Sequence, residues 1–201
     1  MKNILASLAG VVVLGAAVLT APAFAAPNES LRKAPELSFN IPGKGPQLLS
    51  QYRGKVVALG FIFTTCPHCK AASKVMTKFQ EEYGARGLQV IDVAVNPNAD
   101  LLVDDFVKEN NVGFPVGWVL QAQMVSFMNW DSARFVVPQM VLIDRKGIIH
   151  YQTPPTEDEN WDKLMTESAI RQHIEELLGS RSTRATPHTG NVRAAAGRPG
   201  L

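Results

Sequence analysis

Both cysteines of the chain lie in one four-residue motif, Cys66-Pro67-His68-Cys69. The apolar run from Val56 to Phe63 precedes the motif and is bounded by turn signals, which predicts a fully buried strand. After the motif, apolar residues recur at helical spacing as far as Gly84, which predicts a helix. The chain must therefore fold so that both sulfurs stand where a buried strand meets the first turn of a helix.

This position favours a reactive thiol at Cys66. A helix N-terminus presents free N–H groups and a partial positive charge, and both stabilise a thiolate. Pro67 suits a first helical turn, and His68 adds a donor or a positive charge near the sulfur. Cys69 lies one turn further on, within reach to resolve a mixed disulfide. We therefore interpret Cys66 and Cys69 as a redox-active disulfide pair, with Pro67 and His68 as the catalytic residues between them.

Other roles for the motif fit less well. A structural disulfide between cysteines three residues apart closes a very small loop and stabilises little. A metal site needs more ligands, and His150, His173 and His188 are scattered along the chain. A covalent haem site needs a histidine directly after the second cysteine, where Lys70 stands. We expect no metal and no other cofactor.

The remaining pattern predicts an α/β fold. Apolar strands joined by helical crossovers favour a sheet that helices cover on both faces. In chain order, the other predicted elements are a short strand around Leu37 to Ile41, a strand at Leu88 to Val95, a helix at Leu101 to Asn110, a strand at Val136 to Ile143 interrupted by Pro138, a turn at 144–147, a hairpin strand at Ile148 to Gln152 and a helix from Trp161 to Leu177.

Composition supports a single domain between two dissimilar ends. The chain has 201 residues, 46% of them hydrophobic, and a formal charge of only +2, which argues against a nucleic-acid partner. Lys2, the apolar run that follows it and Ala23-Phe24-Ala25 predict a signal peptide over 1–25, cleaved after Ala25. Residues 26–179 then form the domain, and 180–201, rich in Arg, Ala and Gly, form a disordered tail. The mature protein would be periplasmic or secreted, or held at a membrane if the signal is uncleaved.

From about Pro35 to Gly179 the sequence resembles the thioredoxin-fold superfamily, and within it the extracytoplasmic TlpA-like thiol–disulfide oxidoreductases. Beside the cysteine motif, Gly54-Lys55-Val56-Val57 resembles the family's lead-in to the active-site strand, and 142–147 resembles its late hairpin. The resemblance implies a central mixed sheet flanked by helices. It also implies a TlpA-type helix and strand insert, which we place within Leu88 to Phe114.

The resemblance also implies roles for residues outside the motif. Pro138 would be a cis-proline facing the active-site disulfide, and Val137 would offer its backbone to an extended substrate segment. The activity would be thiol–disulfide exchange with protein thiols and disulfides as substrates. Turnover would need an electron partner, expected to be a membrane protein.

The chain departs from the family at three positions. Thr65 and Ile62 stand where tryptophans are frequent, and Gly60 stands where many thioredoxin-fold enzymes keep a buried carboxylate. The usual proton acceptor for Cys69 is therefore missing from its usual place. His68, a water molecule or a carboxylate of the insert such as Glu109 remain as candidates.

The direction of electron flow is open. Pro67-His68 and Val137-Pro138 match the oxidase DsbA, whereas the hairpin and the insert are similar to the TlpA-like reductases, which commonly carry Pro-Pro in the motif. The dipeptide favours a relatively oxidising couple.

Three other functions compete with disulfide exchange. A peroxiredoxin-like peroxidase would need Thr and Pro three and seven residues before Cys66, where Phe63 and Leu59 stand. A Sco-type copper-delivery protein spaces its cysteines one residue further apart and would need a third ligand, for which His150 is the candidate. The third is a binding module with a structural disulfide.

A separate apolar group could form a substrate-facing patch, but typical burial favours the core for its residues, which are Met124, Phe127, Met128 and Trp130.

Overall fold

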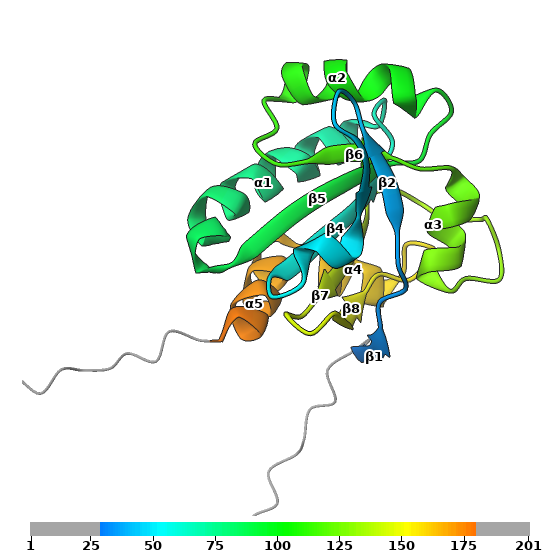
Figure 1. Ribbon diagram of the computed structural model, residues 1–201. Helices are drawn as coiled ribbons and strands as arrows, with labels where there is room; N and C mark the ends of the chain where they lie inside the picture. Colours follow the sequence, from blue (N-terminus) through cyan, green and yellow to red (C-terminus); the bar gives the residue numbers. More distant parts are fainter. Residues whose placement is uncertain (1–28, 180–201) are drawn as a thin grey trace, which may run out of the picture.

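The computed structural model describes residues 29–179, which form one mixed sheet with helices on both faces (Figure 1). The strand order is β1-β8-β7-β4-β5-β6-β2-β3. The strands are β1 (Glu29–Lys33), β2 (Ser38–Ile41), β3 (Gly45–Leu48), β4 (Val56–Ile62), β5 (Leu88–Ala94), β6 (Val116–Trp118), β7 (Gln139–Ile143) and β8 (Ile148–Gln152). The helices are α1 (Pro67–Tyr83), α2 (Ala99–Asn110), α3 (Gln121–Met128), α4 (Glu159–Met165) and α5 (Glu167–Leu178), with short 3-10 helices at Leu49–Tyr52 and Gly84–Arg86.

β4 lies in the middle of the sheet and is buried at every residue. It pairs in parallel with β5 and antiparallel with β7, so its backbone is hydrogen-bonded on both edges. A strand that is covered on both faces has apolar residues on both sides, so its sequence is a continuous apolar run. The run from Val56 to Phe63 predicts such a strand, and β4 confirms it. The chain leaves β4 at its carboxyl end, passes through the cysteine motif and returns through α1 to begin β5.

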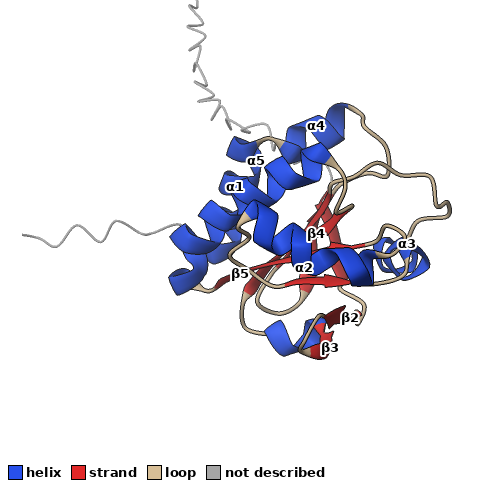
Figure 2. Cartoon of the chain, turned by 90° about the horizontal axis from the view of Figure 1, so that it is seen from above, coloured by secondary structure: helices blue, strands red, loops and turns tan. Residues whose placement is uncertain are grey.

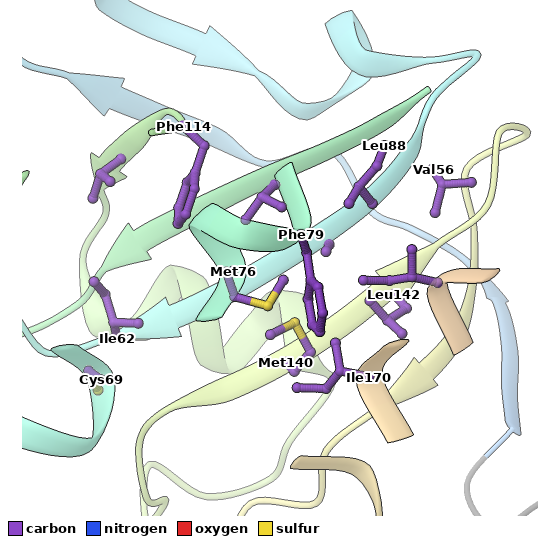
Figure 3. Packing of buried hydrophobic residues seen from close by; sticks show 14 of the residues in the cluster. Val56, Ile62, Cys69, Met76, Phe79, Leu88, Phe114, Met140, Leu142 and Ile170 are labelled. Carbon is purple, nitrogen blue, oxygen red and sulfur yellow. The ribbon is translucent and has the colours of Figure 1, made fainter. Parts of the chain in front are cut away.

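Alternate residues of β4 and β5 face two separate cores. One core lies under α1, α2, α4 and α5, and the other lies between the sheet and α3, on the opposite side in Figure 2. Figure 3 shows the first core, in which Phe79 of α1 packs with Met76 and Met140, and Cys69 lies at one end. The two-residue period of a strand therefore decides which side chains meet α1.

The α/β prediction is confirmed, with differences in detail. The predicted helix from Trp161 to Leu177 is two helices, α4 and α5, which meet at Thr166. Thr166 has an extended backbone and caps α5 by accepting a hydrogen bond from Ala169 N–H. Two strands and one helix were not predicted: β1, β3 and α3. They are short, and tertiary pairing rather than their own pattern specifies them.

The insert predicted within Leu88 to Phe114 corresponds to α2 and β6. The helix lies inside that range, and β6 begins just beyond it at Val116. β6 extends the sheet past β5 in parallel and touches β2 through the pair Asn40 and Trp118. The predicted signal peptide and tail lie outside the described residues. Between residues 29 and 179, no helix has the length and apolar character needed to cross a bilayer.

The core under α1 provides a stability prediction. Replacing Phe79, which is fully buried, with Ala should lower the free energy of unfolding by about 3–5 kcal/mol in urea titrations, because it removes a large apolar side chain and leaves a cavity. The control is Leu101→Ala, since Leu101 is 73% exposed; it should change stability by less than about 0.5 kcal/mol. Similar losses for both variants would contradict the packing described.

Candidate active site

Cys66 stands at the junction between β4 and α1. It is the N-cap residue of α1, with an extended backbone, and its carbonyl accepts a hydrogen bond from Lys70 N–H at 3.1 Å. Pro67 occupies the first helical position, as predicted, where a missing N–H costs no helix hydrogen bond. Cys66 is half-buried, whereas Pro67 and His68 are exposed. A partner protein can therefore reach Cys66 and His68 from outside.

Cys69 lies one turn further along α1 and points into the core. It is fully buried, and Phe63 N–H donates to its sulfur at 3.5 Å. Both cysteines are free thiols in this structure. Burial raises the pKa of the Cys69 thiol far above its ordinary value; the Phe63 N–H opposes this effect, while neighbouring Cys66 and Asp92 add to it. The two sulfurs therefore differ in kind: one is accessible, and the other is buried and held as a thiol.

The peptide bond between Val137 and Pro138 is cis, as the resemblance implied. It lies just before β7, and the Cys66 sulfur approaches the Val137 carbonyl at 3.9 Å. Val136 N–H donates to the Pro155 carbonyl at 2.9 Å, and the side chain of Gln139 donates to the Val136 carbonyl. These bonds hold the loop in place, so that Val137 lies against the cysteine motif although it is far away in sequence.

Two groups that the sequence analysis missed support the site. Asn96, which follows β5, accepts hydrogen bonds from both the backbone N–H of Thr64 (2.9 Å) and its hydroxyl (3.3 Å). This contact fixes the segment between β4 and Cys66. Beside that segment, the ring of Phe63 meets the ring of Phe135 edge-on at 6.2 Å, and Trp130 packs on Phe135 at 5.9 Å. These three half-buried rings form an aromatic border next to the cysteine motif.

The possible substrate-facing patch on α3 is mostly core. Met124, Phe127 and Met128 are buried against the sheet, as typical burial favoured. Only Trp130, beyond the end of the helix, is half-buried and part of the aromatic border.

A buried carboxylate is present, but it comes from a different strand. Asp92 of β5 pairs in register with Gly60 of β4 and is 2% exposed. Glu109, a candidate from the sequence, instead pairs with Lys70 at 3.7 Å and has a side chain that is 66% exposed. Glu109 therefore lies at the surface, away from the buried Cys69 sulfur. One signal could have revealed Asp92: it is the single charged residue in the apolar run from Leu88 to Val95.

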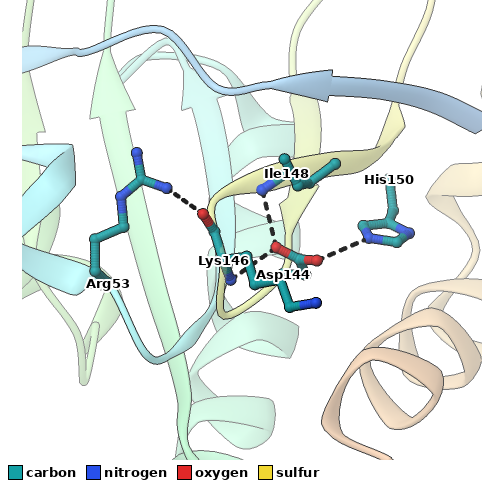
Figure 4. A network of polar contacts seen from close by, with 5 residues as sticks. All are labelled: Arg53, Asp144, Lys146, Ile148 and His150. Atoms are coloured by element: carbon teal, nitrogen blue, oxygen red, sulfur yellow. Dashed lines mark hydrogen bonds and ion pairs between the residues drawn. The ribbon is translucent and has the colours of Figure 1, made fainter.

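His150, the candidate copper ligand, lies away from the cysteines. Figure 4 shows it beside the β7–β8 turn, where its Nε2 is 3.2 Å from Asp144 Oδ2. This turn stands at the opposite end of β7 from Pro138, which lies next to Cys66. Within residues 29–179, no three His, Cys, Asp or Glu side chains gather in a way that could hold a metal ion.

Comparison with known proteins decides the family. The sequence pattern of the redoxin family matches residues 29–172, which is most of the chain. The chain belongs to the redoxin family. This redoxin is also similar to two proteins named thiol-disulfide oxidoreductase ResA. The one from Oceanobacillus iheyensis is 37% identical over 68 residues, which is 34% of this chain and 35% of that protein. The one from Geobacillus kaustophilus is 28% identical over 64% of this chain and 67% of that protein.

Solved structures agree on the fold of this redoxin. A Chlorobium tepidum protein assigned as thiol:disulfide interchange protein DsbE superposes with a TM-score of 0.62 and 24% identity, over 76% of this chain and 99% of that one. A thiol:disulfide interchange protein from a Bacteroides species gives 0.61 and 13% identity, over 80% and 97%. The resemblance stated from the sequence is confirmed: this is a thioredoxin-fold redoxin of the TlpA-like oxidoreductase group.

The different environments of the two sulfurs predict selective alkylation. Iodoacetamide added to the reduced protein at pH 7 should modify Cys66 at least about tenfold faster than Cys69, because Cys69 is buried and its pKa is raised. Mass spectrometry of the Cys66→Ser and Cys69→Ser variants would give the two rates separately, and the unfolded protein would serve as the control for equal reactivity. Equal rates in the folded variants would contradict the assigned environments.

Proposed function

We propose that this redoxin exchanges disulfides with protein substrates through Cys66 and Cys69. The observation that carries the proposal is the pairing of a half-buried cysteine at a helix N-terminus with a second, fully buried cysteine one turn away. A substrate can reach the first sulfur and cannot reach the second. The pair therefore suits a two-step exchange in which the substrate is attached at Cys66 alone.

The same residues serve both directions of the exchange. As a reductant, the Cys66 thiolate attacks a substrate disulfide, and one substrate sulfur leaves as a thiolate. Cys69 then attacks Cys66, releasing the second substrate thiolate and leaving the Cys66–Cys69 disulfide. As an oxidant, the enzyme begins with that disulfide: a substrate thiolate attacks the Cys66 sulfur, and Cys69 leaves as a thiolate. A second substrate thiolate then attacks the substrate sulfur of the mixed disulfide, which forms the substrate disulfide and releases Cys66 as a thiolate. Each full cycle moves two electrons between protein and substrate.

The segment at Val137 supports a binding mode that needs little sequence specificity. Val137 and the cis-proline lie against Cys66, and the neighbouring backbone groups of Val136 are already bonded within the domain. An extended substrate segment could pair with Val137 by strand addition, with its cysteine over Cys66. The aromatic border of Phe63, Trp130 and Phe135 would receive apolar side chains that flank the substrate cysteine.

The cellular setting is part of the proposal. The predicted signal peptide would place the domain outside the cytoplasm, in the periplasm or beyond, where disulfides persist. A membrane redox partner would then renew the Cys66–Cys69 pair, since glutathione does not set the redox poise there.

Trapping tests the exchange reaction. The Cys69→Ser variant, expressed with its full N-terminus, should accumulate mixed disulfides with other proteins, because nothing resolves the bond at Cys66. These species should appear on non-reducing gels and vanish with reductant. The matched control is Cys66→Ser, in which the remaining cysteine is buried; it should trap at least about tenfold less. Equal trapping by both variants, or none by either, would rule out the proposed reaction.

The reduction potential tests the direction. The Pro67-His68 pair favours a couple above about −150 mV, closer to DsbA at about −120 mV than to thioredoxin at about −270 mV. Glutathione buffers of varied composition would give the value. Replacing His68 with Pro, as in the TlpA-like reductases, should lower it. A wild-type value below about −220 mV would make the enzyme a reductant and assign the direction to the architecture instead.

A further inference from the structure

Asp92 is a carboxylic acid placed inside an apolar core. It is 2% exposed, and strand alternation turns it toward α1, on the same face as Val90 and Ala94. Isolated charges are rarely buried, because removing a carboxylate from water is expensive unless the group is paired or protonated. The backbone of Asp92 pairs with both neighbouring strands, as any residue of a sheet does, and this pairing does not require an acidic side chain.

The sequence makes room for this carboxylate on two sides. Gly60 stands opposite on β4, and a Cβ at that position would collide with Oδ1 of Asp92. From α1, the Ser73 hydroxyl donates a hydrogen bond to Oδ2 at 2.6 Å. Ser73 is itself 1% exposed. A glycine and a buried serine thus form the space around the acid.

This space lies near the buried thiol. Ser73 is four residues after Cys69 on α1, so the two side chains lie on the same face of the helix. The charge of Asp92 also acts on Cys69, contributing to the raised pKa of that thiol. Burial raises the pKa of Asp92 to about 6, and the Ser73 hydrogen bond counteracts part of this rise. The carboxylate is thus able to take up or release a proton near neutral pH.

We propose that Asp92 holds the proton that Cys69 releases when Cys69 attacks the mixed disulfide at Cys66. This inference rests on the proposed exchange reaction and names a residue for its second step. The Cys69 thiol gives its proton to the Asp92 carboxylate, and its sulfur forms a bond to the Cys66 sulfur. The bond between Cys66 and the substrate breaks, and its electron pair leaves on the substrate sulfur. In the reverse direction, protonated Asp92 returns the proton to Cys69 as that sulfur leaves.

Few other titratable groups face Asp92. From α1, these are Cys69 and, beyond it, Cys66. β4 and β6 carry no ionisable side chain. The acids and the lysine of α2 are exposed, on the side away from its buried residues Val103 and Phe106, and the nearby Lys70–Glu109 pair is at the surface. His68 of α1 is also ionisable, and it is exposed beside the cysteines. A pH effect on the second step between pH 5 and 7 is therefore assigned to Asp92 where it persists in a His68→Gln variant.

Reaction of the reduced protein with Ellman's reagent separates the two steps. Cys66 releases the first coloured thiolate at a rate proportional to reagent concentration, and Cys69 releases the second at a rate independent of it. In the wild type, the second rate should rise with pH and level off above an inflexion near pH 6. In Asp92→Asn it should be at least about tenfold slower at pH 7 and show no such plateau, because a general base typically contributes about 10²–10⁴ in rate. The first rate should stay within twofold of the wild type.

Three further variants test the role itself rather than the packing. Ser73→Ala removes a hydrogen bond to the ionised carboxylate, so the inflexion should move to higher pH. The double variant Gly60→Asp with Asp92→Gly puts an acid into the same space from β4 and should restore the plateau. Glu109→Gln, the matched surface control, should leave both rates and the inflexion unchanged.

The outcomes are distinguishable. An unchanged second rate in Asp92→Asn, or an unmoved inflexion in Ser73→Ala, would overturn the role of Asp92 while leaving exchange intact. If Asp92→Asn does not fold, the shift in Ser73→Ala and the rescue by the double variant still decide. A wild-type protein that shows no second release would instead overturn the proposed exchange reaction itself.

Discussion

The structure depends on the complete burial of β4. All seven of its residues are covered, with a second core packed on each face. Because both edges are also paired, the strand fixes the position of its carboxyl end relative to β5 and β7. The cysteine motif follows that end of the strand. The position of β4, the most constrained element in the molecule, therefore fixes where the reactive sulfurs lie. A site held within about 0.5 Å by rigid elements is what an exchange between two sulfurs requires.

Three chain segments meet around the two sulfurs, and each contributes a different property. The start of α1 supplies the half-buried Cys66 and the buried Cys69. The loop before β7 supplies Val137, whose carbonyl faces Cys66, and the end of β5 supplies Asn96, which holds Thr64. None of these contacts is between neighbours in sequence. The sheet brings these groups together because the carboxyl ends of β4 and β5 and the start of β7 lie side by side at the same end of the strands.

The buried carboxylate of Asp92 also depends on β4. A strand as buried as β4 tolerates a glycine at position 60, and that glycine leaves the space that Asp92 fills from the neighbouring strand. The acid and Ser73 are hydrogen-bonded beneath α1, and Cys69 lies one helical turn before Ser73 among the same core side chains. Burial in this region of low dielectric disfavours the charged forms of both groups, and this is the main reason why the carboxylate and the thiol have raised pKa values.

The sequence by itself determined the elements whose patterns are strong and local. These are the apolar runs of β4 and β5, the amphipathic α1 and α2 and the turn before β8, together with the position of Cys66 and Cys69 at a strand-to-helix junction. Resemblance added the cis bond before Pro138. Short strands such as β1 and β3 were missed because pairing partners specify them. The break at Thr166 was missed because the apolar spacing continues through it.

Only the tertiary structure decided what surrounds the buried sulfur. From the sequence, Gly60 indicated that a carboxylate was absent, and Glu109 was a candidate to replace it. The register between β4 and β5 instead places Asp92 directly opposite Gly60, while Glu109 lies at the surface. The physical reason is that a strand pairing joins residues 32 positions apart in the chain, and no local pattern encodes which residue will stand across from another.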